Sequence, residues 1–66
     1  MADRVDFYRG YDIAIYHSGR PNVRATIQER NGLPPIHDSA LEKSIPAALE
    51  KAKELIDQKL AALNSN

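Results

Sequence analysis

An amphipathic segment near the C-terminal end limits the folds open to this chain more than any other feature. From Ser44 to about Leu63, apolar residues recur every three or four positions, which places them on one side of an α-helix. Ser44 is a favourable N-cap residue, and Pro46 fits the first helical turn, where its missing N–H costs nothing. Because one helix cannot bury its own apolar stripe, the rest of the chain must cover it. That stripe comprises Ile45, Leu49, Ala52, Ile56, Leu60 and Leu63, flanked by Ala48, Leu55 and Lys59.

Two segments before this helix alternate between apolar and polar residues, as half-buried β-strands do. Between them, residues 17–22 contain Ser, Gly, Pro and Asn, which are typical of a hairpin loop. The residues expected on the buried side are Tyr11, Ile13 and Ile15 in the first strand and Val23, Ala25 and Ile27 in the second.

A third strand is expected near residues 33–42, because Asn31-Gly32 is a strong two-residue hairpin signal. Pro34 and Pro35 cannot donate ladder hydrogen bonds, so this strand belongs at the sheet edge, and an irregular loop over 33–43 stays an alternative. A further alternative is a helix that opens at Ser39 with a capping box. Before the first strand, Gly10 interrupts the pattern, which makes residues 5–8 an N-terminal extension or part of the same strand across a bulge.

The predicted fold class is therefore α+β: a three-stranded antiparallel meander with one C-terminal amphipathic helix packed on one face. We expect a single domain over residues 1–66, with 1–4 and 64–66 frayed. The opposite face of the sheet should stay uncovered and polar enough for water. It would display Asp12, Ala14, Tyr16, Arg24, Thr26, Gln28 and Arg30.

Size and composition narrow the function classes. A chain of 66 residues without cysteine has a thin core and no disulfides, which makes self-association plausible and leaves little room for an enclosed substrate pocket. We expect no enzyme activity, no cofactor and no metal, since His17 and His37 lack companion ligands at metal-binding spacing. Zero net charge disfavours nucleic acid as a partner. With neither a signal peptide nor a membrane-spanning run, the expected location is the cytoplasm.

Arginine and lysine are segregated, because all five Arg precede residue 31 and all four Lys follow residue 42. Arginine suits phosphate and carboxylate recognition, so the arginines of the uncovered face form a candidate partner surface. The more ordinary interpretation is that these strand positions simply carry long solvated side chains. An alternative is DNA binding by the sheet face in the major groove. The candidate surface residues are Tyr16, Arg20, Arg24, Gln28 and Arg30.

The segment Tyr8-Arg9-Gly10-Tyr11-Asp12-Ile13 resembles the opening of small uncharacterised bacterial proteins. The expected order of elements and the helix from Ala47 to Leu60 are similar to the N-terminal domain of HicB-type antitoxins, which bind a toxin partner and often DNA. The Pro-Gly-Cys type turn of those domains is missing here, so the resemblance transfers no binding residue. It implies a bacterial source and a regulatory or binding role.

These observations together favour a small, non-catalytic bacterial interaction module of the cytoplasm. We expect it to be homodimeric or to bind another protein through an edge strand or the uncovered sheet face. The alternative is a DNA-binding or antitoxin-like regulatory protein that uses the same face.

Overall fold

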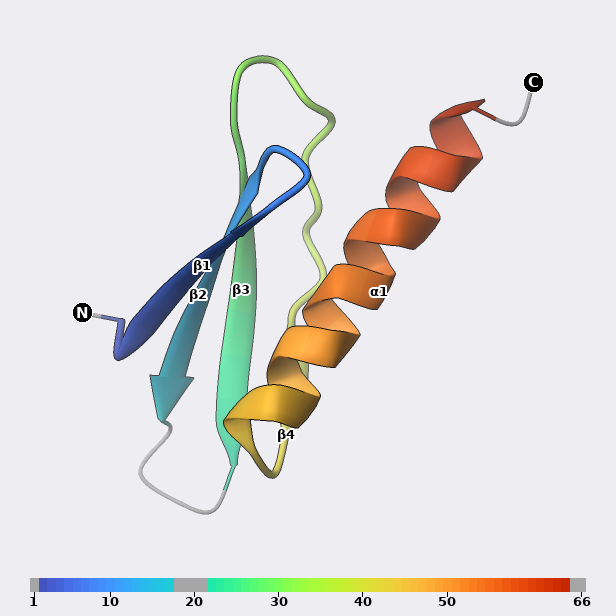
Figure 1. Cartoon of the computed structure of the whole chain (residues 1–66). Coiled ribbons are helices and arrows are strands. Elements are labelled where there is room, and N and C mark those ends of the chain that lie inside the picture. The colour runs from blue at the N-terminus through green and yellow to red at the C-terminus, as the bar shows by residue number, and fades with distance from the viewer. Residues whose placement is uncertain (1, 18–21, 65–66) are drawn as a thin grey trace.

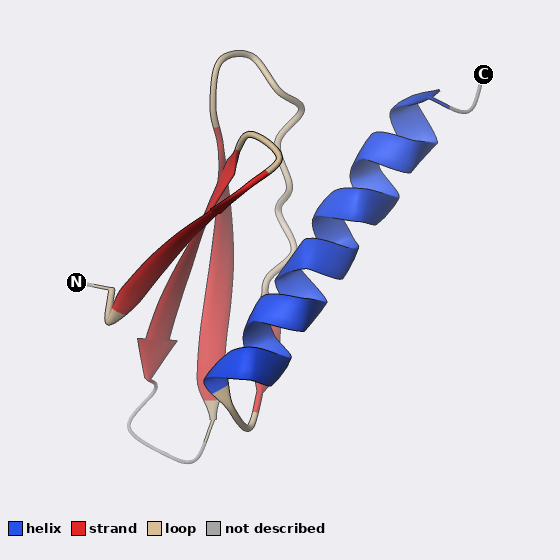
Figure 2. Cartoon of the chain, in the orientation of Figure 1, coloured by secondary structure: helices blue, strands red, loops and turns tan. Residues whose placement is uncertain are grey.

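The computed structural model describes residues 2–17 and 22–64 and shows one antiparallel sheet with a helix across one side (Figures 1 and 2). The strands lie in chain order, β1-β2-β3-β4. The α+β class and the C-terminal helix are thus as predicted, but the sheet has four strands rather than three. The elements are β1 Arg4–Tyr8, β2 Tyr11–His17, β3 Val23–Glu29, β4 Ala40–Glu42 and α1 Ile45–Asn64.

The additional strand, β1, results from a tight turn at Arg9-Gly10. Both residues have positive φ, 49° and 87°, as the central positions of a type I′ hairpin turn require. Tyr8 therefore pairs directly with Tyr11, and the whole of β1 pairs with β2. The expectation of an extension or bulge was wrong, because Gly10 closes a hairpin rather than interrupting one strand. Arg is an unusual first residue for this turn, which normally favours Asn, Asp or Gly.

The prediction of a turn and a third strand after β3 is only partly confirmed. Asn31 and Gly32 form the expected turn, with φ of 50° and 77° and a hydrogen bond from the Leu33 N–H to the Arg30 carbonyl of 3.1 Å. Residues 33–39, however, form no strand, since two consecutive prolines remove the donors that a ladder needs. Pairing resumes only at β4, whose three residues align with Val23–Ala25. The predicted strand over 33–42 is therefore mostly irregular, and no helix starts at Ser39.

Helix α1 begins as predicted. The Ser44 hydroxyl accepts a hydrogen bond from the Ala47 N–H at 3.3 Å, and the Ser44 carbonyl accepts one from the Ala48 N–H at 3.0 Å. Ala48, Ala52 and Ile56 are completely buried. Leu63, predicted to lie in the apolar stripe, is instead 50% exposed. Residues 1–4 and 64–66 were expected to fray, but Arg4 is the first residue of β1 and Asn64 is the last residue of α1.

The core lies between α1 and the face of the sheet that the alternation predicted. Its strand residues are Tyr11, Ile13, Ile15, Val23, Ala25, Ile27 and Ala40. The irregular segment 33–39 runs beside α1 and closes one end of this core (Figure 1). There the Tyr11 hydroxyl donates a 2.7 Å hydrogen bond to the Pro34 carbonyl, and burial raises the pKa of Tyr11. Within residues 2–17 and 22–64, no helix is long and apolar enough to cross a membrane.

Candidate interaction surface

No part of residues 2–17 and 22–64 covers the sheet face opposite α1, as predicted, and the strand register fixes which residues share that face. Residues directly opposite each other in neighbouring strands lie on the same face. Val5 aligns with Ala14 and Thr26, while Arg24 lies between Tyr16 and Leu41. We call this surface the open face. Its residues are Val5, Phe7, Asp12, Ala14, Tyr16, Arg24, Thr26, Gln28, Arg30 and Leu41.

Four of the five residues predicted as a partner surface lie on the open face. Tyr16 is half-buried and aligns with Arg24, which is exposed. Gln28 and Arg30 are also exposed, at the other end of β3. Arg20 lies outside the described residues. The predicted set thus occupies both ends of β3 rather than one compact cluster.

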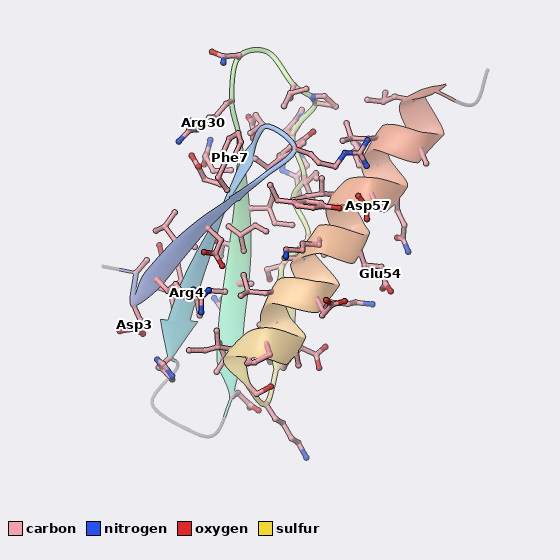
Figure 3. The ribbon with its side chains drawn as sticks, in the orientation of Figure 1. Asp3, Arg4, Phe7, Arg30, Glu54 and Asp57 are labelled. Atoms are coloured by element: carbon pink, nitrogen blue, oxygen red, sulfur yellow. The ribbon has the colours of Figure 1, made fainter. Side chains whose placement is uncertain are left out.

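Arg30 is held within the open face rather than projecting freely. Its Nε donates a 2.9 Å hydrogen bond to the carboxylate of Asp12, which lies on β2. Its guanidinium lies 4.9 Å from the centre of the Phe7 ring, an arrangement that allows a cation–π contact (Figure 3). Asp12 therefore neutralises one of the two described arginines of this face, and the phosphate-binding capacity of the surface falls accordingly.

Three apolar side chains of the open face were not predicted from the sequence. Val5 is 59% exposed, Phe7 60% and Leu41 56%. Val5 and Phe7 lie on β1, which was not predicted as a separate strand, and Leu41 lies on the short strand β4. The signal that could have found the first two is the alternation of Val5 and Phe7 with polar neighbours just before Arg9-Gly10.

The open face combines aromatic residues and arginine and lacks lysine and glutamate. Aromatic residues and Arg are enriched at protein–protein interfaces, whereas Lys and Glu are depleted. The open face carries Phe7, Tyr16, Arg24 and Arg30, and its ten residues include neither Lys nor Glu. Those two residue types occupy the solvent side of α1 instead, as Glu50, Lys51, Glu54 and Lys59.

A polar cluster fixes the β1–β2 turn against α1. The Asp57 carboxylate accepts hydrogen bonds from the Tyr8 hydroxyl at 2.9 Å and from Arg9 Nη1 at 2.8 Å. The ammonium group of Lys53 lies 5.4 Å from the centre of the Tyr8 ring. The hydrogen bond from Arg9 and then that from Tyr8 lower the pKa of Asp57, and the bond to Asp57 raises the pKa of Tyr8. These contacts position β1, and with it Val5 and Phe7.

A second polar contact joins the start of β1 to the end of β2. The Asp3 carboxylate lies 2.9 Å from the backbone nitrogen of His17 and 2.8 Å from its Nδ1, and these hydrogen bonds lower the pKa of Asp3. The Asp3 N–H also donates to the Ile15 carbonyl at 2.8 Å. The Asp3 contact therefore fixes the start of β1, and the Asp57 cluster fixes its end.

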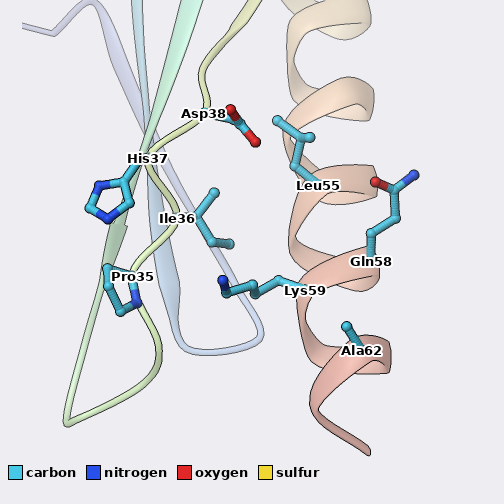
Figure 4. Close-up of a pocket in the computed structure, with 8 residues that line it drawn as sticks. All are labelled: Pro35, Ile36, His37, Asp38, Leu55, Gln58, Lys59 and Ala62. Carbon is cyan, nitrogen blue, oxygen red and sulfur yellow. The ribbon is translucent and has the colours of Figure 1, made fainter. Parts of the chain in front are cut away.

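A groove of about 450 Å³ lies on the other side of the molecule, between segment 33–39 and α1 (Figure 4). Ile36 and Leu55 give it an apolar floor, and the Lys59 side chain extends toward Ile36. His37 points away from the helix, so the polar side chains do not converge on one point as a catalytic site requires. Its other lining residues are Pro35, Asp38, Gln58 and Ala62.

No group of three or more metal-ligating side chains occurs among residues 2–17 and 22–64. Comparisons with protein-family models, with curated proteins and with solved structures found no match for this chain. The similarity to HicB-type antitoxin domains therefore stays a hypothesis, and the function has to be argued from the surfaces.

Proposed function

We propose that this protein is a non-catalytic interaction module of the bacterial cytoplasm, homodimeric in its assembly, that binds a protein partner through the open face. The observation that carries the proposal is the exposure of Val5, Phe7 and Leu41 on a sheet face that also displays Tyr16 and Arg24. Tyr and Arg are enriched among the residues that dominate binding energy at protein interfaces, and Phe is enriched in interface cores.

The alternative, DNA binding through the same face, has weaker support. It relied on Arg20, Arg24 and Arg30 with Tyr16, but Asp12 pairs with Arg30 at 2.9 Å. Exposed Val5 and Leu41 gain nothing from a phosphate backbone. Titration with a mixed-sequence duplex at low salt separates the two functions: we expect no binding at tens of micromolar. Binding that weakens steeply with salt and with Arg24→Ala would favour DNA instead.

Affinity capture from a bacterial lysate with matched variants tests the proposed partner surface. Phe7→Ser removes an apolar side chain from the open face, and Leu63→Ser removes one of similar exposure from α1. We expect a protein that the wild type and Leu63→Ser retain and that Phe7→Ser releases. Purified components should then reproduce the loss, by at least roughly 10-fold in Kd, as truncation of a central interface residue typically does.

The proposal is wrong if the captured proteins bind the Phe7→Ser and Tyr16→Ser variants as well as the wild type. Circular dichroism spectra and urea midpoints of the variants serve as the folding control, so that a lost partner is not mistaken for a lost fold.

A further inference from the structure

Strand β1 leaves a hydrogen-bonding edge without a neighbouring strand in the described part of the chain. It is the first strand of the sheet and pairs only with β2. Tyr8 and Tyr11 flank a two-residue turn, so they form the hydrogen-bonded pair that closes the hairpin. Because the pairing alternates, the backbone groups of Arg4 and Asp6 also face β2, and those of Val5 and Phe7 face outward. Such an edge is a template for another strand.

A second copy of the chain can add to this edge only in an antiparallel arrangement with two-fold symmetry. In that arrangement one residue lies opposite itself, and its neighbours lie opposite each other in the second copy. The choice of the central residue therefore decides which charges meet. Like charges directly opposite each other are destabilising, whereas opposite charges stabilise the pair of strands.

Only pairing centred on Val5 makes these charges complementary. Arg4 of each copy then lies opposite Asp6 of the other, and Val5 lies opposite Val5. Centring on Asp6 places two carboxylates together, and centring on Arg4 places two guanidinium groups together. Centring on Phe7 requires Val5 to pair with Arg9, which belongs to the turn and is bound to Asp57 at 2.8 Å. Centring on Val5 places Phe7 opposite Asp3, whose N–H stays bonded to the Ile15 carbonyl at 2.8 Å, so the outward hydrogen bonds of this register come from Val5 and from the Phe7 N–H.

Within one copy, Arg4 and Asp6 already face the same side of β1 and form an ion pair of 3.3 Å. The side-chain exposures, 53% for Arg4 and 30% for Asp6, leave both groups accessible to a second copy. Charged residues on an edge strand often discourage association. Here they disfavour the pairings centred on Arg4 and on Asp6 and favour the one in which the two copies exchange this ion pair.

The opposite edge of the sheet cannot extend the assembly in the same way. Strand β4 has only three residues, 40–42, and the start of α1 follows directly. Short edge strands are a common protection against further pairing. Association through β1 thus closes at two copies instead of growing into a fibre.

We propose that two copies of this protein join their β1 strands antiparallel about Val5, with Arg4 of each copy paired to Asp6 of the other, to form one eight-stranded sheet. This inference deepens the proposed function, on whose homodimeric assembly it rests.

One copy offers an open face of only roughly 350 Å², from strands of 5, 7, 7 and 3 residues at about 3.3 Å per residue and about 4.8 Å between strands. Stable interfaces bury about 800 Å² per partner, so dimerisation brings the continuous face into that range.

Complementary charge variants test the pairing. Asp6→Arg places Arg opposite Arg in its own dimer, and Arg4→Asp places Asp opposite Asp. We expect sedimentation equilibrium to show each variant alone self-associating at least roughly 10-fold more weakly than the wild type, since two mismatched pairs replace two matched ones. An equimolar mixture of the two variants should recover a dimer, because every pair in the mixed dimer is again opposite in charge.

Glu50→Lys and Lys43→Glu provide the control, since both residues are exposed and lie away from β1. They change the net charge by the same amounts and should alter self-association less than about 2-fold. Val5→Pro removes the central outward N–H from an edge strand, where proline is tolerated. It should therefore give a folded monomer, as judged by circular dichroism.

A wild type that stays monomeric up to millimolar concentration overturns the β1 pairing, as does a mixture that associates no better than its separate variants. Neither result affects capture of a partner by the open face, which the Phe7→Ser comparison reports. Conversely, the protein could dimerise through β1 while its captured partners bind the Phe7→Ser variant as well as the wild type. That result would refute the open face as the partner site but not the pairing of β1 strands.

Discussion

The two faces of the sheet use the same strands for opposite purposes. Along β2, Ile13 and Ile15 point toward α1 and are completely buried, whereas Ala14 and Tyr16 point to the open face and stay accessible. Most of the covered face packs against α1. The open face combines aromatic, aliphatic and arginine side chains, with Arg30 held by Asp12. The difference shows that alternate residues of one strand can serve the core and an exposed surface.

The β1 strand contributes very differently to these two faces. On the covered side it supplies Arg4, Asp6 and Tyr8, of which Tyr8 contacts α1 through Asp57. On the open side it supplies Val5 and Phe7, both more than half exposed. Helix α1 packs mainly on β2, β3 and β4. Strand β1 therefore contributes less to the core than to the exposed surface of the sheet.

The largest predicted difference between the faces is in stability. Ile13→Ala leaves a cavity beneath α1 and should cost about 2–5 kcal/mol of unfolding free energy. A core of this size provides only about 3–5 kcal/mol in total, so the variant should be partly or fully unfolded. Ala14→Ser, one residue away on the open face, should change stability by less than about 0.5 kcal/mol. Urea denaturation of both variants checks this, and equal costs would refute the division of the strand.

The turn that creates β1 should be sensitive to a single methyl group. Gly10 has φ of 87°, and a Cβ there would collide with the side chain of Leu33. Gly32 has φ of 77° with nothing within 4 Å of the same position. Gly32→Ala should cost about 1–2 kcal/mol from backbone strain alone. Gly10→Ala should cost more, because Leu33 packs against the core and must also move.

Thermal melting of the two glycine variants measures this difference. A Gly10→Ala variant as stable as the wild type would contradict the Arg9-Gly10 turn and, with it, the placement of Val5 and Phe7 on the open face.

Replacing an anchor of the open face should affect stability much less. Phe7 is 60% exposed and contacts Arg30 at 4.9 Å, so Phe7→Ser should cost about 1 kcal/mol or less. The urea midpoint provides the measurement. A cost approaching that of Ile13→Ala would show that Phe7 belongs to the core and is not held available for a partner.

The smallest effect concerns pH. Hydrogen bonds from Arg9 and Tyr8 hold the pKa of Asp57 below its usual value in the folded state. The ionised carboxylate therefore stabilises the fold above the unfolded pKa of about 3.9, and this contribution disappears as the pH falls through the lower folded value. The gap in urea midpoint between wild type and Asp57→Asn should be present at pH 7 and shrink near pH 2.

Glu50→Gln, at an exposed position of α1, supplies the matched control and should show no such gap. Asp3, whose pKa the contact with His17 also lowers, titrates in the same direction in every variant. Some loss of stability in acid therefore remains after Asp57 is replaced.

Local patterns were sufficient to predict the core but not the edges of the sheet. The alternation of β2 and β3 and the spacing along α1 identified nearly every buried residue, because periodicity reports directly on burial. The cap at Ser44 and the turn at Asn31-Gly32 were also correct, since both depend on local chemistry. The prediction that Leu63 is buried was wrong, because the apolar stripe of α1 continues past the end of the sheet. The spacing of apolar residues does not show where the sheet that covers them ends.

The missed features depend on contacts distant in sequence. Strand β1 depends on an Arg-Gly turn whose Arg9 is bound by Asp57, 48 residues away in the sequence. Sequence rules based on neighbouring residues do not include such a contact. The helix residue Asp57 binds Tyr8 and Arg9, and its position on α1 gives no sign of these contacts. The candidate surface was consequently predicted from three arginines with Tyr16 and Gln28, and its exposed apolar residues Val5, Phe7 and Leu41 emerged only from the strand pairing.

Backbone NMR of isotope-labelled protein at decreasing concentration tests most directly whether two copies of the protein contact each other through β1, beside the open face. From millimolar to low micromolar concentration, the amide signals of Val5 and Phe7 should shift most, with smaller changes at Ala14 and Tyr16. Those of Glu50, Lys51 and Glu54 on α1 should stay constant. Shifts concentrated on the exposed side of α1, or spectra that do not change over this range, would contradict the account.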